Sequence, residues 1–566
     1  MHIYAGGETE YGITLVMPED HPRRYMRFYG SLLSKRVIHG AVSSPSLGLS
    51  CVGPGSGTTE RMFLHEYLLE ECHEEDEARE GDEDGDPLDD DKIYVAGHQY
   101  FDVRMGNGAR LYVDCGHPEY STGMVSNARD ALLAQLAGDM IVEEGRRVAE
   151  ECMRKEYGPD IRLLIYKNNS DGQGRIAKSY AHHENYSLDR ATLSRIFTVD
   201  RRAGAYAIFP GELAPIVMNF LISRIIITGA GKVWRDVLPL PRPYQISQRA
   251  DFFLKEFGEH ATEVRPIINT RQVPYASTCG RLHVIPGDTN VSHYAIYLTW
   301  GTGLVFFMML QDGFITRYGK NVLKQLHRPV QAFWRVSGDL TLRKKLCYAD
   351  GSSTTALDMQ REFCDLAEMF VRQNHLGEQW IDVVEKWGGA LDGLDGDEEH
   401  WNDHNVSRNL DWVAKLRFIR RYQENRRVDW SHALCKNIDL AYHDTNPQRS
   451  IAQKLQNRGD LSALAHEDEI VHWVRHPPPD TRSFLLGSII ARYGKHLYSA
   501  DWSDIVFPRG RLTIGDPGIG GEHEVQHLFA GDLSCKEFVL RLEQWINHVC
   551  LSGCEWKAPN HLSFWT

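Results

Sequence analysis

The sequence predicts an α+β protein in which helices back a sheet with one polar face. Two segments, residues 6–12 and 109–114, alternate polar and apolar side chains with the period of two that is typical of strands. The stretch from Asn290 to Tyr498 has a mostly helical pattern. A further strand-rich segment begins at Asp501, after a proline break.

The length and this change of pattern indicate more than one domain. A chain of 566 residues can bury a large core and often divides. We predict a large domain over residues 1–490 and a small C-terminal domain over residues 491–566. The last element of the small domain is expected to be a helix from Cys535 to Val549.

The strand expected over residues 109–114 is the centre of the candidate site. Arg110, Tyr112 and Asp114 share one face of it, and the residues between them point into the core. A cation, a phenol and a carboxylate in one row need partners if they are to be buried. The polar run continues to Glu119. The alternative interpretation is an edge strand with a solvated face.

The N-terminal strand places Glu8 and Glu10 on one face. Two like charges at this spacing repel, and a divalent cation is the usual compensation. Hard oxygen ligands suit magnesium that bridges the phosphates of a nucleotide. Two exposed glutamates on an edge strand are the alternative.

Three side chains further along are also candidates. His183 and His283 lie in polar segments and could bind a metal or a phosphate, although a lone histidine is often structural. Arg224 lies inside the apolar run 220–233, which could be a strand or a helix. A buried arginine needs an anionic partner, either a carboxylate or a phosphate. The GAGKV at the end of this run lacks the spacing of a P-loop.

The charge distribution argues against a nucleic-acid-binding protein. The net charge is −14, and the segment from Glu70 to Asp91 holds fourteen acids and one base. The rest of the chain is near neutral and shows no basic stripe. The acidic block belongs to a flexible insertion over residues 48–96, directly ahead of the candidate strand. Such a loop could gate the site or receive a substrate, or it could be a solvated surface loop.

Cysteine usage and hydropathy predict a cytoplasmic protein without a membrane segment. The eleven cysteines are scattered without a CxxC pair, as expected for reduced thiols. Residues 1–20 lack the apolar core of a secretory signal. The most apolar run, from Tyr294 to Leu310, contains Gly301 and Gly303 and is shorter than a membrane span. We expect a buried helix there.

Several short motifs, in a fixed order from residue 1 to about residue 494, resemble the family of Pup ligases and Pup deamidase/depupylases. The motifs are GGETEYGI, NGARLYVDCGHPEYS, YKNNSDGQG, SYAHHENY, ITGAGKV, YQISQRADF, RPIINTR and RLHVIPGD. The resemblance implies a glutamine-synthetase-like large domain with a concave antiparallel sheet packed by helices. It implies an enzyme that acts on the terminal side-chain carboxylate or amide of a small protein tag.

The resemblance also implies ligands and partners. ATP, or ADP plus phosphate, and Mg²⁺ would be the cofactors. A small disordered Pup-like tag and the proteins that carry it would be the partners, with an indirect link to a proteasome. We expect neither nucleic acid nor membrane among the partners.

The resemblance assigns roles to residues, and the residue patterns extend the sets. Asp114 falls on the catalytic aspartate. The predicted metal-binding residues are Glu8, Glu10, Tyr112, Glu119, His183 and His283. The predicted nucleotide-binding residues are Arg110, Thr122, Arg224 and Trp502. We expect the N-terminal carboxylates and Asp114 to converge on one magnesium-bound polyphosphate.

The two branches of the family would use Asp114 differently. In a ligase it would take a proton from the lysine that displaces phosphate from the activated tag. In a depupylase it would act as a base toward water or attack the carboxamide carbon itself. The long insertion, the five-residue step from Asp114 to Glu119, and the DGQG and DWSDIVF phrases resemble the depupylase branch. The ETEYG, TGAGKV, LDMQREF and DLAYHD phrases resemble the ligase.

We favour the depupylase because an insertion and a changed loop length alter access to a site. Residues 272–277 (QVPYAS) replace an acidic stretch that is usual in both branches. Met124 or a neighbour replaces an acid expected shortly after the HPEYST phrase, and residues 175–178 enlarge the loop before HENY. These departures indicate a divergent tag. A small-molecule carboxylate-amine ligase and a non-catalytic tag-binding scaffold remain alternatives from other classes.

Overall fold

The computed structural model describes most of the chain, and it contains two compact units. The described residues are 3–21, 30–53, 102–170, 178–200, 207–234, 243–260, 264–271, 279–403, 405–508, 510–549 and 554–557. The first unit comprises residues 1–12, 125–135 and 166–470, and the second comprises residues 13–124, 136–165 and 471–566. Residues 54–96 of the predicted acidic insertion and the stretch 272–277 lie outside the described residues.

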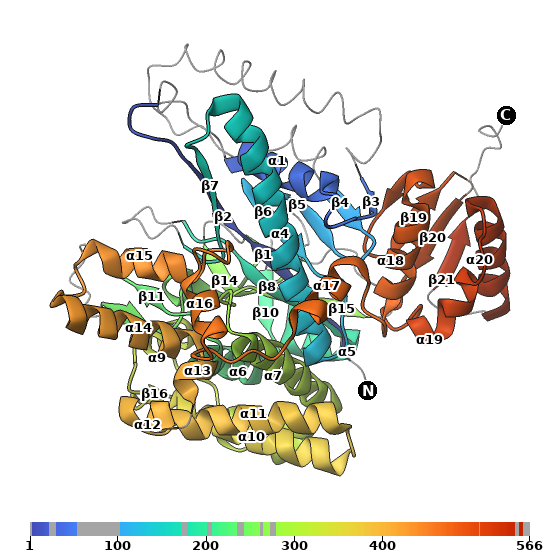
Figure 1. Ribbon diagram of the computed structural model, residues 1–566. Coiled ribbons are helices and arrows are strands. Elements are labelled where there is room, and N and C mark those ends of the chain that lie inside the picture. The colour runs from blue at the N-terminus through green and yellow to red at the C-terminus, as the bar shows by residue number, and fades with distance from the viewer. Residues whose placement is uncertain are drawn as a thin grey trace, which may run out of the picture. The chain divides into compact units, whose positions relative to one another are not determined.

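The first unit is built on a mostly antiparallel set of strands (Figure 1). In the order in which they pair, these are β13 (Phe253–Gly258), β14 (Arg265–Asn269), β15 (Gly280–Val284), β8 (His182–Leu188) and β1 (Ala5–Glu10). Only the pairing of β13 with β14 is parallel among these described pairs. Because successive side chains of a strand point to opposite faces, Glu184, Tyr186 and Leu188 of β8 share one face, and His183 and Asn185 share the other.

Two apolar helices cover the face of β8 that carries Glu184 and Tyr186. They are α6 (Ala214–Thr228) and α7 (His293–Asp312). The ring of Tyr186 lies 4.5 Å from that of Phe307 and 6.4 Å from that of Trp300, both on α7. The run 220–233, which periodicity left open between strand and helix, is therefore largely helical.

Helix α7 confirms the buried helix expected over Tyr294 to Leu310. It is the one helix among the described residues that is long and apolar enough to cross a membrane by length and composition. However, 94% of its most apolar 18-residue window is buried inside the protein. Its burial against β8 accounts for its hydropathy, because a core helix is apolar on all sides.

The helices expected between residues 290 and 498 are present. They include α8 (Phe314–Tyr318), α9 (Pro329–Ser337), α10 (Ala356–Gln373), α11 (Glu378–Leu394), α12 (Glu398–Asp403), α13 (Val406–Asn409), α14 (Asp411–Arg426), α15 (Ala433–Tyr442), α16 (Ile451–Asn457) and α17 (Glu467–Arg475). Smaller elements of the first unit are α5 (Arg190–Ile196), β9 (Phe197–Asp200), β10 (Ala207–Pro210), β11 (Lys232–Val233), β12 (Tyr244–Gln245), β16 (Leu346–Cys347) and β17 (Ser353–Thr354).

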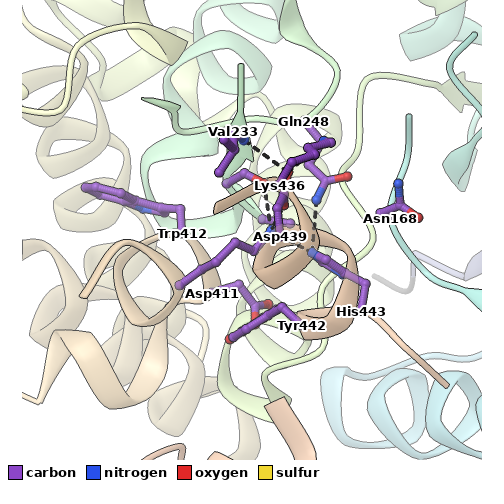
Figure 2. A network of polar contacts seen from close by, with 12 residues as sticks. Asn168, Val233, Gln248, Asp411, Trp412, Lys436, Asp439, Tyr442 and His443 are labelled. Atoms are coloured by element: carbon purple, nitrogen blue, oxygen red, sulfur yellow. Dashed lines mark hydrogen bonds and ion pairs between the residues drawn. The ribbon is translucent and has the colours of Figure 1, made fainter. Parts of the chain in front are cut away.

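A buried polar network joins α14 and α15 to the loop that follows β7 (Arg162–Tyr166) (Figure 2). The Lys415 ammonium donates to Asp439 and to Nε2 of His443, each at 2.8 Å. Gln248 lies 2.9 Å from the same His443 nitrogen and accepts from the backbone of Asn169. Two donors meet at Nε2, so His443 is neutral with its proton on Nδ1. Burial lowers the pKa of His443 accordingly.

The second unit carries another antiparallel set of strands. In the order in which they pair, these are β6 (His117–Ser121), β5 (Arg110–Asp114), β4 (Asp102–Met105) and β3 (Cys51–Val52). Strand β2 (Gly12–Val16) pairs with β7 (Arg162–Tyr166). The strand predicted over residues 109–114 is thus confirmed.

Two helices of this part of the chain touch through glycines. Helix α1 spans Gly30–Ser43, after residues 22–29, which lie outside the described part, and helix α4 spans Ala128–Tyr157. A Cβ at Gly40 would lie 2.4 Å from the carbonyl oxygen of Gly145, so the two backbones approach too closely for a side chain.

Most of the C-terminal segment shares one hydrophobic cluster, and the predicted boundary at residue 490 falls inside one of its helices. The segment contains α18 (Arg482–Tyr493), β18 (Ser499–Ala500), β19 (Asp504–Phe507), β20 (Gly510–Ile514), α19 (Glu522–Val525), α20 (Cys535–Val549) and β21 (Cys554–Lys557). Leu485 and Ile489 of α18 share one cluster with Leu512 and Phe538. A cut at 490 would pass through α18 and divide that cluster. Residues 471–566 belong to the second compact unit as a whole, and α20 matches the predicted terminal helix.

Candidate functional site

The predicted catalytic aspartate stands beside a tight hairpin turn of the second unit. Asp114 ends β5 and pairs with His117 at the start of β6. The two residues between them have positive φ angles, 49° at Cys115 and 84° at Gly116. These angles are those of a type I′ turn, which matches the twist of the flanking strands. The five-residue step from Asp114 to Glu119 is therefore a two-residue turn that keeps the ladder intact.

The polar face of this hairpin is arranged as the alternation predicted. Leu111 and Val113 are buried, whereas the side chains between them are only partly buried. The register places three polar pairs across the two strands: Arg110 with Ser121, Tyr112 with Glu119, and Asp114 with His117. One face of the hairpin thus carries, in order, a cationic row (Arg110 with Ser121), an acidic row (Tyr112 with Glu119) and the catalytic candidate Asp114.

The Asp114 carboxylate stands out because it is half-buried and unpaired. No hydrogen bond or ion pair reaches it from the described residues. A carboxylate with both oxygens open can accept a proton or attack an electrophilic carbon. The fold thus presents a reactive group at the rigid end of a strand.

Tyr112 and Glu119 make the acidic row. The Tyr112 hydroxyl donates a short hydrogen bond to Glu119 Oε1. The Ser121 hydroxyl lies 3.4 Å from the same phenol oxygen. Glu119 is only 1% exposed. A buried carboxylate requires compensation by donors or a cation, so this pair fits the oxygen ligands of a hard metal ion.

Arg110 is held by an acid and stacked on the next residue of its face. Its guanidinium makes two hydrogen bonds to Asp102, of 2.6 and 2.7 Å, and lies 3.9 Å from the ring centre of Tyr112. Burial would lower the pKa of Arg110, but the bonds and charge of Asp102 outweigh it and raise this pKa. The cation is permanent and oriented, as a phosphate-binding residue requires.

The other predicted nucleotide residues of the second unit lie apart in sequence. Thr122 is buried directly after β6. Trp502 lies in the turn between β18 and β19, where its ring stacks on the guanidinium of Arg104. Sequence reasoning missed Arg104, although it stands directly opposite Arg110 in the β4–β5 register. Extending the alternation of β5 to its neighbour would have found it.

The first unit holds a compact cluster of three predicted metal ligands. Glu8 on β1 pairs with His183 on β8, and His283 comes from β15. His183 Nδ1 lies 3.0 Å from Glu8 Oε2, and His283 Nε2 lies 3.5 Å from the same oxygen. One ligand atom from each residue can be chosen so that all three lie within 4.8 Å of one another.

The protonation states of the Glu8 carboxylate and the two imidazoles favour cation binding. Burial would raise the pKa of Glu8, but the hydrogen bond from His183 and the close approach of His283 outweigh it and hold this pKa well below its ordinary value. Burial lowers the pKa of His183 to about 3 and also lowers that of His283. An ionised carboxylate beside neutral imidazoles is the state that binds metal.

A cation fits the donors that this structure leaves open. Both ring nitrogens of His283 are buried without a hydrogen-bond partner among the described residues. His183 donates from Nδ1 to Glu8, which leaves Nε2 with a lone pair. Two imidazoles and a carboxylate are softer than the all-oxygen set that Mg²⁺ prefers, and they suit Mn²⁺ or Zn²⁺ as well.

Glu8 and Glu10 have different neighbours although they share a face. Glu8 Oε1 accepts from the Asn185 amide at 3.0 Å and lies 3.8 Å from Arg281 Nη1. Glu10 Oε2 accepts from the backbone of Ala181 at 2.6 Å. Asn185 and Arg281 were not predicted, yet each lies two residues from a predicted histidine on the same strand. The two-residue alternation of side chains along a strand would have identified both residues.

The assignment of Arg224 to the nucleotide is corrected by its observed partner. Its guanidinium makes two bonds to Glu184, of 2.5 and 2.9 Å, and the side chains are 4% and 0% exposed. Glu184 points to the helix-covered face of β8, opposite to His183. The buried arginine therefore has the carboxylate partner that was its other predicted option, and it supports the sheet from behind.

Each unit thus assembles part of the predicted set. Glu8, His183 and His283 come together in the first unit. Arg110, Tyr112, Asp114 and Glu119 come together in the second. Convergence of the two sets on one polyphosphate stays a prediction.

The family follows from comparison with known proteins. The family model described as Pup-ligase protein matches residues 3–506. The chain belongs to this family. The resemblance seen in the sequence is therefore confirmed, and the match covers the strands that carry the predicted site.

Curated relatives of the Pup-ligase family carry both activities in their names. A depupylase of Acidothermus cellulolyticus is 34% identical over 512 residues, 90% of this chain and 91% of the relative. A Pup deamidase/depupylase of Mycobacterium tuberculosis is 33% identical over 446 residues, 77% and 82% of the two chains. A Pup–protein ligase of Mycobacterium bovis is 34% identical over 406 residues, 71% and 83%.

Solved structures of the Pup ligase PafA share the fold. The complex of Pup with PafA matches with a TM-score of 0.71 and 24% identity over 97% of this chain and 93% of that chain. PafA in complex with ADP matches with a TM-score of 0.64 and 27% identity over 82% and 95%. The predicted α+β fold, with an antiparallel-rich sheet packed by helices, is thereby confirmed.

Proposed function

We propose that this protein is a depupylase/deamidase-like amidohydrolase. It cleaves the isopeptide or side-chain amide at the C-terminal Glu or Gln of a Pup-like protein tag, with ATP and Mg²⁺ as cofactors. The observation that carries the proposal is the half-buried Asp114 carboxylate, which is unpaired among the described residues and stands at the end of a rigid hairpin. Membership of a family of enzymes that act on this tag supplies the substrate class.

Two observations favour hydrolysis over ligation. The depupylase relative covers 90% of this chain at 34% identity, whereas the ligase relative covers 71% at the same identity. The five-residue step to Glu119, which resembles the depupylase branch, corresponds to a well-formed two-residue turn. The length of this step is thus part of the hairpin itself, which supports using it to assign the chain to the depupylase branch.

Asp114 would carry the chemistry in one of two ways. It takes a proton from the water that attacks the amide carbon, or one of its own oxygens attacks that carbon. Both routes require a carboxylate oxygen that no neighbour already holds. The Asp114 carboxylate at the end of the hairpin meets this requirement in either role, as base or as nucleophile.

The cofactors would be held by residues of both polar faces. Glu8, His183 and His283 would hold a divalent cation in the first unit, and Tyr112 with Glu119 would do so in the second. Arg110, Thr122 and Trp502 would hold the nucleotide. When bound, cation and nucleotide would supply positive charge and order at the carboxyl end of the tag. Asp114 and Arg110 keep their orientation on β5 in either case.

The partners follow from the same assignment. The PafA complex with Pup is a precedent for a tag-bound relative. We propose a small disordered Pup-like tag and tagged proteins as substrates, an indirect proteasome link, and a cytoplasmic location. The departures at residues 272–277 and at Met124 favour a divergent tag. Slower cleavage of a standard Pup conjugate than by an ordinary depupylase is expected.

Two parallel incubations test the proposal. The first combines the protein with a preformed tag conjugate, Mg²⁺ and a slowly hydrolysed ATP analogue, and follows release of free tag. The second combines the protein with tag, an acceptor protein and ATP, and follows conjugate and ADP. Release of tag without nucleotide turnover is expected. Conjugate formed in stoichiometric proportion to ADP would instead establish the ligase.

The ligase is the second candidate because ligase relatives are equally similar over the part they cover. A tag that ends in glutamine separates the two further. A deamidase releases ammonia from it, whereas a ligase leaves it unchanged. Ammonia release that requires Asp114 would exclude the ligase as the main activity.

A further inference from the structure

Arg104 lies in the row of the second unit that holds the predicted nucleotide residues. Strand β4 pairs with β5 so that Arg104 stands directly opposite Arg110. Ser121 on β6 is the next member of the row. Two arginine side chains therefore project from directly paired positions on one face. Like charges at directly opposed positions destabilise a sheet, so the pair needs a compensating reason.

The two arginines are compensated differently. Arg110 makes its two bonds to Asp102 on the neighbouring strand β4. Arg104 reaches into the C-terminal segment, where Nη2 lies 2.5 Å from Asp501 Oδ1. The Asp501 side chain is 70% exposed, whereas that of Arg104 is 7% exposed. An exposed acid is screened by water, so this ion pair compensates the buried cation only weakly.

The Arg104 guanidinium also stacks on an aromatic ring. The guanidinium carbon lies 3.9 Å from the ring centre of Trp502. The backbone amide of Trp502 donates to Asp501 at 2.7 Å, so the acid holds the start of the turn while the arginine holds the ring. A planar guanidinium stacks on an indole face in a way that a lysine ammonium does not reproduce.

Burial and the adjacent Arg110 act on the same group. Together they lower the pKa of Arg104 to about 10, with burial as the larger cause. The group is still charged at neutral pH. Its position is therefore strained electrostatically, and an added anion near the two arginines would relieve that strain.

We propose that Arg104 is a positioning residue for the nucleotide, acting by holding the Trp502 ring in its binding orientation beside the cationic row of the sheet. This inference rests on the proposed function, because the nucleotide role of Trp502 comes from the family resemblance. It adds a residue that ties the C-terminal segment to strand β4. The ligand class is a nucleoside di- or triphosphate, with an aromatic surface for Trp502 and an anionic chain for the arginines.

The test is a double-mutant cycle on nucleotide affinity. The dissociation constants of ADP and ATP are measured by calorimetry with Mg²⁺ for the full chain and for Arg104→Leu, Trp502→Leu and the double variant. Each single change is expected to weaken binding about tenfold, within the range of a partly buried cation–π contact. Since Arg104 acts through the ring, the double variant should bind no more weakly than Trp502→Leu alone.

A matched control and a conservative variant separate positioning from general stability. Arg36 on α1 is also ion-paired, to Glu156 at 2.7 Å, and lies 5.9 Å from the Tyr157 ring. Arg36→Leu should leave nucleotide affinity unchanged. Trp502→Phe keeps a ring for the guanidinium and should retain most of the affinity, and Arg104→Leu should still weaken binding in that background.

The outcomes distinguish failure of the proposed nucleotide site from failure of the Arg104 role alone. If Trp502→Leu and Arg110→Leu both leave affinity unchanged, the proposed nucleotide residues are wrong. If Trp502→Leu weakens binding and Arg104→Leu does not, only the role of Arg104 fails. Additive losses in the double variant would also overturn that role, because Arg104 would then act independently of the ring.

Discussion

The polar faces of the two units follow one geometric rule and reach different chemistry. In the first unit, alternate positions on three strands gather Glu8, His183 and His283, whose donors converge on one another. In the second unit, alternate positions on a hairpin gather Arg110, Tyr112 and Asp114, and the aspartate stays unpaired among the described residues. The first face is arranged to retain a ligand. The second is arranged to keep a reactive oxygen open.

The difference arises from what lies behind and beside each face. The first face is backed by the buried pair of Arg224 and Glu184 and by helix α7, so its imidazoles are fixed and neutral. The second face ends in a tight turn and carries side chains that are only partly buried. Rigidity therefore comes from buried electrostatics in one unit and from backbone geometry in the other.

The largest expected effect is on catalysis at the second face. Asp114→Asn should reduce cleavage of a tag conjugate by a factor of about 10² to 10⁴, as expected for loss of a catalytic proton acceptor. No described partner is lost, so the variant should keep its melting temperature and nucleotide affinity. Rates, calorimetry and thermal unfolding are measured together. Asp532→Asn, at an exposed position, is the matched control. Retained turnover would remove Asp114 from the mechanism.

The next effect concerns the support behind the first face. Arg224→Met leaves the Glu184 carboxylate buried without its cation and should lower the free energy of unfolding by about 3–5 kcal/mol. Denaturant titration measures this loss. Arg317→Met removes an ion pair to Asp312 with a 55% exposed arginine side chain, and should cost less than about 1 kcal/mol.

A double variant checks the physical cause. Arg224→Met with Glu184→Leu removes both buried charges and should recover part of the lost stability. If the double variant is less stable than Arg224→Met alone, the cost does not come from an unpaired carboxylate.

A smaller effect concerns the metal preference of the first face. His283→Ala removes one imidazole donor and should weaken Mn²⁺ binding about tenfold or more, with a lesser effect on Mg²⁺, because imidazole is the softer ligand. Metal titration by calorimetry gives both constants. Equal losses for the two ions would argue that His283 orders Glu8 and does not itself bind the cation.

The smallest effect is at the turn. Cys115→Asn creates an Asn-Gly pair, the preferred sequence of a type I′ turn, at a position with φ of 49°. It should raise the free energy of unfolding by about 0.5–1 kcal/mol without changing the register. Denaturant titration detects this change, and unaltered cleavage would show that the turn keeps Asp114 in place. A destabilised variant would mean that Cys115 makes a contact worth more than the relief of strain.

The sequence predicted those parts of the site that local periodicity determines. The row of Arg110, Tyr112 and Asp114 follows from alternation alone, and so does the shared face of Glu8 and Glu10. The buried helix α7 followed from its hydropathy. These features depend on side chains a few residues apart, and the local pattern therefore contains the information.

The remaining features depend on contacts that no local pattern encodes. Arg224 meets Glu184, which lies 40 residues away in the chain, so its partner could not be chosen from the sequence. The residues 220–233 are buried on all sides, which removes the period that separates a helix from a strand. The turn at Cys115 and Gly116 was missed because its first position is not Asn or Asp.

The two-residue turn also limits how this site can change over time. Insertion of a single residue between Asp114 and Glu119 would force a bulge or rotate every following side chain of β6 to the far side of the sheet. Such a chain would lose the acidic row in one step. A single-residue insertion is therefore disfavoured at this turn, and a step of another length needs a different loop that restores the register of β6.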